Sequence, residues 1–214
     1  MRIAVLAATG ATGRQLVVQA LERGHEVVAL VRDPRRLDRP ATPGLLPLVA
    51  DVTDPQSVAR ALTGVDAVVS GLGRTPDGPD DVMTQGARAV TAARGDGAPP
   101  RVVWLGAHGT GRSAAAAGAA TRGLLRLIAG AELPDRAAAE EVVLRAGGSV
   151  LHAGRLTDGG GAPVRTLDPA DVPRRLLPRG ISRATVAAAM LDEAEQPRFA
   201  GRVGVPLAGG PREG

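Results

Sequence analysis

The residues best suited to binding a ligand come early in the chain, in the stretch Ala7-Ala-Thr-Gly-Ala-Thr-Gly13. This is a G-x-x-G-x-x-G pattern with Ala7 in the first glycine position. Glycines in such a turn let the backbone approach a pyrophosphate, and the following helix N-terminus supplies free N–H groups and a partial positive charge. The pattern predicts a phosphate-binding turn, although a glycine-rich turn between a strand and a helix also occurs in other α/β proteins.

A second group of candidate residues follows the second apolar run, where Arg32 is succeeded by Asp33-Pro-Arg-Arg36. NAD sites usually place an acidic residue here against the ribose 2′-hydroxyl, whereas NADP sites offer arginine to the 2′-phosphate. An arginine fork matches phosphate geometry with two hydrogen bonds, so the cluster favours NADP(H). Asp33 argues for NAD, and the alternative for the whole group is a solvated set of surface charges.

Two further stretches are expected at the same edge of the sheet. Asp51-Val52 ends a third apolar run, where an adenine ring would lie and the carboxylate would accept a hydrogen bond from its amine. Ser70-Gly-Leu-Gly73 ends a fourth run, and its small residues would let a cofactor cross the carboxyl ends of the strands. The alternative for Asp51 is a helix cap or a surface turn, although Asp54 already takes the cap position.

The composition excludes several kinds of chemistry. All 26 basic residues counted as Lys or Arg are arginines, and the chain has no Lys, Cys, Tyr or Asn. Without Cys there is no disulfide, thiolate nucleophile or cysteine metal site. Without Lys there is no Schiff base and no Walker P-loop. The Tyr–Lys pair of standard short-chain dehydrogenases is absent for the same reason.

Net charge and hydropathy restrict the kinds of partner. The sequence pI near 11.1 is typical of a nucleic-acid binder, but the net charge is only +4 and every base is arginine. We find no helix–turn–helix pattern or basic stripe and expect no direct binding to nucleic acid. The first apolar run, residues 3–7, is too short for a signal sequence or a membrane span. We expect a cytoplasmic protein with a small-molecule substrate, as a monomer or weak homo-oligomer.

Short apolar runs alternate with helical patterns along the chain, as in βαβ units. We expect strands at 3–7, 25–32, 46–50, 65–70, 101–105, 149–153 and 202–207, and helices at 13–23, 55–62, 80–94, 135–145 and 181–195, with a weaker helical pattern at 123–128. The range 159–178, rich in Gly and Pro, is expected to be a loop over the ligand cleft. Right-handed crossovers then predict an α/β fold, a Rossmann-type doubly wound parallel sheet, with residues 1–214 as a single domain.

Several of these segments together resemble the atypical short-chain dehydrogenases, and within them the NmrA-like NAD(P)-binding proteins and the biliverdin-IXβ reductase or flavin reductase group. The resemblance covers about residues 2–195 and rests on the glycine-rich turn, Val31-Arg-Asp-Pro-Arg-Arg, Ala50-Asp-Val-Thr-Asp, Asp66-Ala-Val-Val-Ser-Gly-Leu-Gly, Val82-Met-Thr-Gln-Gly-Ala-Arg, Arg155-Leu-Thr-Asp and Ile181-Ser-Arg. It implies one Rossmann-type domain that uses NADP(H). The positions that it implies contact the cofactor are Thr9, Gly10, Thr12, Gly13, Arg32, Arg36, Asp51, Val52, Leu72 and Gly73.

The chain departs from this family at three positions. Ala7 replaces the first glycine and adds a methyl group where backbone and cofactor normally come close. Ala107 stands where the reductases carry a serine near the nicotinamide, and Arg155 aligns with one of their histidines. The family's catalytic roles are therefore not carried over at Ala107 and Arg155.

Three residues near the ends of the fifth and sixth strands remain as catalytic candidates: His108, His152 and Arg155. An imidazole or imidazolium at His108 would donate a hydrogen bond to a substrate carbonyl, and the alternative is an exposed loop histidine. His152 stands inside an apolar strand, where a half-buried sheet histidine is the simpler interpretation. Arg155 and Asp158 alternatively pair with each other rather than with a ligand.

These features predict an NAD(P)H-dependent reductase of the atypical short-chain dehydrogenase type, which reduces a flavin, quinone or similar conjugated small molecule by hydride transfer from NADP(H). Such a substrate takes its proton from solvent, whereas a ketone needs a placed donor for its developing alkoxide. The alternatives are non-redox NAD(P)-binding proteins of the same fold: a redox sensor or regulator, or a repurposed biosynthetic isomerase or cyclase.

Overall fold

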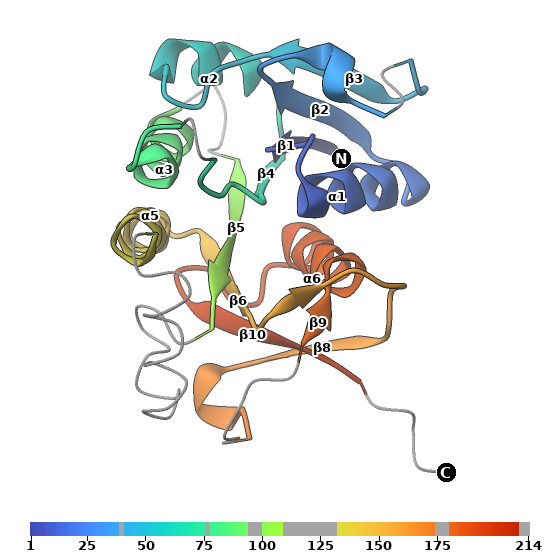
Figure 1. Cartoon of the computed structure of the whole chain (residues 1–214), viewed down its shortest axis with the longest axis vertical. Helices are drawn as coiled ribbons and strands as arrows, with labels where there is room; N and C mark the ends of the chain where they lie inside the picture. The colour runs from blue at the N-terminus through green and yellow to red at the C-terminus, as the bar shows by residue number, and fades with distance from the viewer. Residues whose placement is uncertain (39–40, 76–77, 94–99, 109–131, 174–179, 210–214) are drawn as a thin grey trace.

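An eight-stranded sheet between two layers of helices forms the centre of the protein in the computed structural model (Figure 1). The structure describes residues 1–38, 41–75, 78–93, 100–108, 132–173 and 180–209. The weak helical pattern at 123–128 lies outside these residues. The strands of the sheet are β1 (Arg2–Leu6), β2 (Glu26–Val31), β3 (Leu45–Val49), β4 (Ala67–Ser70), β5 (Arg101–Ala107), β6 (Ser149–Ala153), β8 (Val164–Leu167) and β10 (Val203–Ala208).

The helices cover the sheet on both faces (Figure 1). Their bounds are α1 (Ala11–Glu22), α2 (Pro55–Ala61), α3 (Val82–Ala92), α5 (Leu133–Arg145) and α6 (Arg183–Glu195), with 3-10 turns η1 (Pro34–Arg36) and η3 (Pro169–Asp171). Helices α1 and α6 pack together on one face, and α3 packs between α2 and α5 on the other. Two short strands, β7 (Leu156–Thr157) and β9 (Ile181–Ser182), pair with each other outside the main sheet.

The strand order is β3-β2-β1-β4-β5-β6-β10-β8. All pairs are parallel except β10 with β8, which is antiparallel. The chain moves outward from β1 to β3 and then returns to place β4 on the other side of β1. The predicted fold class, a doubly wound Rossmann-type sheet, is therefore confirmed, and its reversal point lies between β1 and β4, where ligands of such sheets bind.

The central strands are buried on both faces because each contributes alternate side chains to two separate cores. In β1, Ala4 and Leu6 belong to the cluster under α2, α3 and α5, whereas Ile3 and Val5 belong to the cluster under α1 and α6. This explains why the strand reads as an unbroken apolar run. Within the described residues, no helix is long and apolar enough to cross a membrane.

The helices that the sequence predicts at 55–62 and 181–195 are present, and each begins at a side-chain cap. Asp54 accepts a hydrogen bond from the backbone N–H of Gln56 at the start of α2. Ser182 accepts one from the N–H of Thr185 at the start of α6. Each cap satisfies a backbone donor that the helix itself cannot use, which is why such residues mark helix starts in a sequence.

The prediction of a loop at residues 159–178 is wrong for part of the range, and residues 174–178 lie outside the described residues. Residues Val164–Leu167 form β8, which pairs with β10 in antiparallel register, for example Thr166 with Pro206. The segment is only four residues long and is surrounded by Gly and Pro, so no local pattern marks it. Its partner strand lies about 40 residues further along the chain, and only this pairing makes it a strand.

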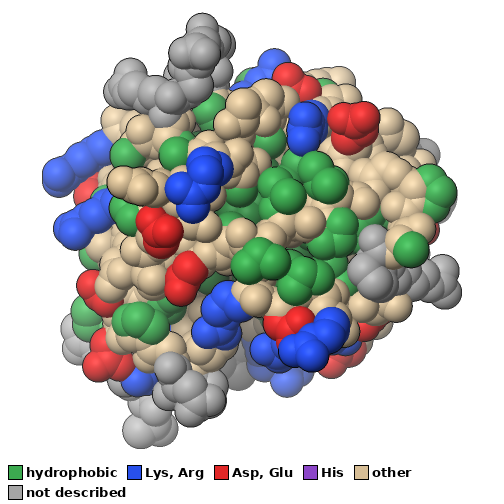
Figure 2. All heavy atoms as spheres, turned by 90° about the horizontal axis from the view of Figure 1, so that it is seen from above, with side chains coloured by type: hydrophobic (Ala, Val, Ile, Leu, Met, Phe, Trp, Pro, Cys, Tyr) green, Lys and Arg blue, Asp and Glu red, His purple; other side chains and the backbone are tan. Residues whose placement is uncertain are grey.

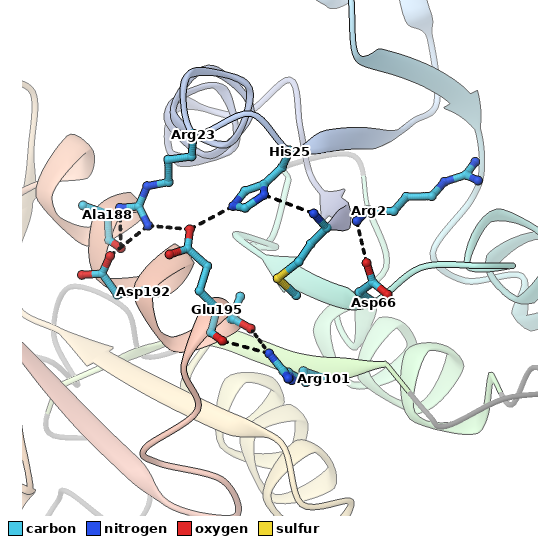
Figure 3. Close-up of polar contacts among 10 residues, drawn as sticks. Arg2, Arg23, His25, Asp66, Arg101, Ala188, Asp192 and Glu195 are labelled. Carbon is cyan, nitrogen blue, oxygen red and sulfur yellow. Dashed lines mark hydrogen bonds and ion pairs between the residues drawn. The ribbon is translucent and has the colours of Figure 1, made fainter.

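Hydrogen bonds and ion pairs join the amino-terminal ends of the strands to α6, on the edge of the sheet opposite the carboxyl ends (Figure 3). The Glu195 carboxylate lies 2.9 Å from Arg23 Nη1 and 2.9 Å from His25 Nε2. Burial alone would raise the pKa of Glu195, but hydrogen bonds from His25 and Arg23 outweigh it and hold that pKa below its usual range. Arg101 donates to the carbonyl oxygen atoms of Ala194 and Glu195.

The β3 edge of the sheet is open and apolar. Figure 2, which looks down on the molecule from the top of Figure 1, shows hydrophobic side chains near the middle of this face, with charged groups around them. Leu46 and Val49 of β3 are 43% and 69% exposed. Pro47 lies between them and lacks a backbone donor, which an edge strand tolerates because no further strand pairs with it.

Candidate functional site

The glycine-rich turn connects β1 to α1 at the reversal point of the sheet. The N–H of Gly10 donates to the carbonyl oxygen of Ala7 at 2.8 Å, which closes the turn. A Cβ atom at Gly13 would lie 2.0 Å from the same carbonyl oxygen, so only glycine lets the helix pack this closely on the turn. Gly10 and Ala11 are exposed, α1 has no side-chain cap, and its first turn has no acidic residue. The helix N-terminus is therefore open to an anion.

Ala7 has a positive φ of 55°. This left-handed backbone is the conformation that glycine adopts without cost and that an L-residue with a Cβ atom disfavours. Ala7 is half-buried and packs against the core under α2, α3 and α5. The departure from the glycine pattern thus leaves the shape of the turn intact but places a strained residue at its first position.

The turn after β4 lies directly against the start of α1. A Cβ atom at Gly71 would be 3.5 Å from Cβ of Thr12 and 3.6 Å from the backbone nitrogen of Gly13. Ser70, which is fully buried, accepts a hydrogen bond from the N–H of Leu72 and holds this turn. Gly73 has nothing within 4 Å of an added Cβ, so this end of the turn faces open space.

The side chains of Val52 and Leu72 both lie close to Gly86 of α3. Two residues that contact the same adenine ring would have to be this close together. A Cβ atom at Gly86 of α3 would lie 2.8 Å from Cδ2 of Leu72, 3.5 Å from Cβ of Val52 and 3.8 Å from Cη2 of Trp104. The ends of β3 and β4 therefore converge over α3. The missing side chain at Gly86 makes this approach possible.

The N-terminus of α3 is held by a residue from another helix. Asp135 of α5 is buried and accepts hydrogen bonds from the backbone N–H groups of Met83 and Thr84, both at 2.9 Å. Asp81, the residue before the helix, makes no side-chain cap. The carboxylate of Asp135 thus satisfies two donors that would otherwise be buried without partners, and it fixes α3 beneath Val52 and Leu72.

The arginines after β2 are not equivalent. Asp33 accepts from Arg35 Nε at 3.0 Å, from Arg35 Nη2 at 3.1 Å and from the Arg35 backbone N–H at 3.0 Å. The hydrogen bonds from the Arg35 side chain, and then from its backbone, lower the pKa of Asp33. Arg32 and Arg36 are both exposed and have no ion pair with any residue in the described ranges. Both oxygens of Asp33 are therefore occupied, whereas two arginines remain available to an anion.

Asp51 lies in a turn and also close to Arg32. One of its carboxylate oxygens accepts from the backbone N–H of Thr53 at 2.9 Å and from the Thr53 hydroxyl at 2.8 Å. These bonds, the backbone one first, lower the pKa of Asp51, and the charge of Arg32 adds to the effect. One carboxylate oxygen of Asp51 therefore stabilises a surface turn, as the alternative interpretation predicts.

His108 follows β5 at the carboxyl edge of the sheet. Its backbone N–H donates to the carbonyl oxygen of Ala153 at 2.8 Å, which continues the pairing of β5 with β6. Its side chain is half-buried, and within the described part of the chain the buried Nδ1 atom has no hydrogen-bond partner. Burial lowers the pKa of His108, and the neighbouring His152 lowers it further. We therefore expect a neutral imidazole at neutral pH.

The expectation that His152 is half-buried is wrong, because its side chain is fully buried. Nε2 of His152 lies 3.0 Å from Oε2 of Glu140 in α5, and the two side chains are 0% and 3% exposed. His152 is the register partner of Gly106 in β5. A Cβ atom at Gly106 would lie 2.5 Å from Glu140 Oε1 and 2.5 Å from His152 Cδ2, so the absence of a side chain in β5 makes room for the pair.

Arg155 is exposed, and none of the described contacts brings its guanidinium to His108 or His152. The alternative pairing of Arg155 with Asp158 is wrong, because Asp158 pairs with Arg183 at 2.7 Å. Strand β9 pairs with β7 in parallel register, and this places the start of α6 next to Asp158. The carbonyl oxygen of Arg155 accepts from the N–H of Ile181.

Two carboxylates of α5, Asp135 and Glu140, were not among the residues that the sequence singled out. Glu140 follows Ala139 and precedes Val143 and Leu144, which are all buried on the same side of the helix. An acidic residue within an apolar stripe is a signal for a buried partner. Asp135 lies one turn earlier, and its partners on α3 cannot be identified from local sequence.

The arrangement fits a dinucleotide. The open start of α1 and the close-packed Gly13 suit a pyrophosphate. Val52 and Leu72 suit an adenine ring. Arg32 and Arg36, which have no ion pair among the described residues, suit a phosphate on the ribose. Thr9 lies in the turn itself, and its carbonyl oxygen accepts from Arg14. The carboxyl ends of β1 to β4 therefore bring the candidate cofactor residues to one edge, and His108 follows on the neighbouring strand β5.

Comparison with known proteins agrees with this arrangement. A family model described as NAD(P)H-binding matches residues 7–197. The chain is similar over its whole length to the anaerobilin reductase ChuY of Escherichia coli O157:H7, with a TM-score of 0.76 and 18% identity, covering 100% of each chain. It is also similar to a protein of Streptococcus pneumoniae TIGR4 described as an NADH-flavin reductase, with a TM-score of 0.76 and 19% identity, covering 98% of this chain and 100% of the other. At this level of identity the likeness concerns the fold alone.

Matches to curated sequences are local. The chain is 38% identical over 69 residues to the photosystem II assembly factor Ycf39 of Synechocystis, which is 32% of this chain and 21% of that protein. The first such relatives are matched over about a fifth of their own length.

Proposed function

Because the chain belongs to the NAD(P)H-binding family, we propose that it is an NADPH-dependent oxidoreductase. The choice of NADPH rests on the different contacts that the charged side chains after β2 make. Asp33, the acceptor that a ribose 2′-hydroxyl would need, is occupied by Arg35. Arg32 and Arg36 have no ion pair among the described residues and are exposed beside the turn. Two free guanidinium groups favour a 2′-phosphate over a hydroxyl.

The proposed substrate is a flavin, a quinone or a similar conjugated small molecule. NADPH supplies a hydride when it is bound. The chain contains no Tyr or Lys and has Ala107 in place of the family's serine, so it lacks the usual donors for a developing alkoxide. A conjugated ring spreads the charge and takes its proton from solvent, so it needs only a weak hydrogen bond at its oxygen. Two solved structures with this fold are described as an anaerobilin reductase and an NADH-flavin reductase, which supports the proposal.

We assign the hydrogen bond to His108. Its Nδ1 atom is buried and unpartnered within the described chain, at the carboxyl end of β5. Its lowered pKa keeps the ring neutral at neutral pH, so it acts as a hydrogen-bond donor and not as a source of the proton. Arg155 and His152 are not expected to touch the substrate, because no described contact brings Arg155 to His108 and because His152 is fully buried.

The test is consumption of NADPH after addition of FMN or a quinone, followed by the absorbance of the reduced nicotinamide. Steady consumption that needs the acceptor, and that is faster with NADPH than with NADH, is the expected result. Tight NADPH binding without consumption by any conjugated acceptor would refute the reductase proposal. The same result would favour the second candidate, a non-redox NAD(P)-binding protein that acts as a sensor or as an isomerase or cyclase.

The second candidate rests on a specific observation, which is the loss of the family's catalytic groups together with an intact cofactor turn. Ala107 removes a hydroxyl, whereas Gly10 and Gly13 keep the geometry of the turn. We give preference to the reductase because His108, at the expected edge, has a ring nitrogen without a hydrogen-bond partner among the described residues. The proposal treats residues 1–214 as a single domain of the atypical short-chain dehydrogenase type, acting in the cytoplasm as a monomer or weak homo-oligomer.

A further inference from the structure

The buried contact between Glu140 and His152 is placed where it can control His108. The Glu140 carboxylate comes from α5, and His152 comes from β6. Two ionisable groups with exposures of 3% and 0% are costly to remove from water, and a well-packed apolar pair is often as stable. A role beyond packing would explain such a pair at the edge of the proposed site.

Space for the pair is created by Gly106. This residue has no side chain, and an added Cβ atom would come within 2.5 Å of Glu140 Oε1 and of His152 Cδ2. Alternate residues of a strand point to the same face of the sheet. Gly106 and His108 are two residues apart at the end of β5, so His108 is the next side chain on the face that the pair occupies.

His108 is joined to the pair by backbone and by charge. Its N–H donates to the carbonyl oxygen of Ala153, the residue next to His152. Burial and then His152 lower the pKa of the His108 ring, so the two imidazoles lie close enough to influence each other. Nδ1 of His108 remains buried and without a hydrogen-bond partner among the residues that the structure describes.

We propose that Glu140 and His152 are positioning residues, which hold the half-buried His108 imidazole so that a ring N–H meets a ring carbonyl oxygen of the substrate. Glu140 binds Nε2 of His152 and fixes the orientation of that ring. The His152 ring in turn supports His108 from the side of α5. This inference rests on the proposed function and narrows it: the substrate carries a carbonyl, lactam or imide group conjugated to the bond that receives the hydride. A negative charge developing on that oxygen is stabilised by the hydrogen bond.

The test compares Glu140→Gln with Glu141→Gln. Glu141 is the next residue of α5 and forms an ion pair with Arg145 at 2.8 Å, so it is a matched control outside the buried pair. The chain has three histidines, so NMR of the imidazole groups resolves each ring and follows its titration. In Glu140→Gln we expect the His108 signals to shift and the pH at which His108 titrates to change, because the neighbouring His152 ring is no longer held by a carboxylate. In Glu141→Gln the His108 signals and their titration should match those of the parent.

The kinetic arm uses NADPH and FMN. Misplacement of a hydrogen-bond donor should lower kcat by about tenfold in Glu140→Gln and change KM little, whereas Glu141→Gln should match the parent. A pair that only fastens α5 to the sheet would lower the melting temperature and leave the His108 signals and titration unchanged, which overturns the inference. If Glu140→Gln does not fold, His152→Gln is measured in the same way. If the parent does not consume NADPH, the reductase proposal fails, and the NMR comparison still decides the positioning role.

Discussion

Replacement of Arg32 by alanine is the most direct test of cofactor choice. Arg32 follows β2, is exposed, and lies close enough to Asp51 to lower the pKa of that carboxyl. It has no ion pair with another described residue. The change should therefore remove a phosphate contact without breaking a contact within the protein. We expect weaker binding of NADPH and unchanged binding of NADH.

The magnitude follows from the kind of hydrogen bond and from its exposure. A hydrogen bond to a charged group contributes about 1.5–3 kcal/mol, which corresponds to about 10- to 100-fold in affinity. Arg32 and Arg36 are both exposed to solvent, which screens their charges. The expected loss is therefore near the lower end, about tenfold for each arginine, and it should shrink as salt is added.

Calorimetric titration of Arg32→Ala and Arg36→Ala with both cofactors measures the effect. Arg35→Ala is the matched control, because Arg35 is 90% exposed and its guanidinium is held by Asp33. It removes the same charge from the same turn but also frees the Asp33 carboxylate, so it should tighten NADH binding, which Arg32→Ala should leave unchanged. Equal affinity of the parent for NADPH and NADH, or the same change in NADH affinity in Arg32→Ala and Arg35→Ala, would refute the assignment.

Three further outcomes are expected. Ala7→Gly should relieve about 1–2 kcal/mol of left-handed backbone strain, which exceeds the roughly 0.4–1 kcal/mol that glycine costs in unfolded-chain entropy. Calorimetry should therefore show tighter NADPH binding, and urea unfolding should show a protein at least as stable as the parent. Weaker NADPH binding would contradict this. His108→Ala should lower kcat with FMN about tenfold. His152→Ala should lower kcat as well, because it misplaces His108, and it should also lower the unfolding free energy. Because burial lowers the pKa of His108, the parent's rate should be flat above about pH 6.5, and a fall through that pH would identify the imidazolium as the acid. Glu195→Gln should lower the unfolding free energy by about 1 kcal/mol at neutral pH. Since hydrogen bonds hold the pKa of Glu195 below its usual range, this difference in stability between parent and variant should disappear as acid protonates the parent's carboxylate. A difference in stability that does not change with pH would argue against the ion pairs as its source.

The order of the elements and the position of the candidate site could be predicted without a structure. The apolar runs, the glycine-rich turn and the caps at Asp54 and Ser182 depend on interactions within a few residues, so they are visible without a structure. The reversal of the sheet beside β1 follows from the handedness of the crossovers. For the same reason, the ends of β2, β3 and β4 could be predicted to share one edge.

Only the tertiary structure decided which charged groups are available there. The sequence places Asp33 and three arginines together, but the fold closes Asp33 onto Arg35 and leaves Arg32 and Arg36 without ion pairs among the described residues. The pair of Glu140 with His152 depends on the packing of α5 over the end of β6 and on the room left by Gly106. Such contacts are set by strand register and close packing between segments, where a shift of one residue turns a side chain to the other face. Local sequence carries no record of that register, and for this reason it identified His152 but neither its burial nor its partner.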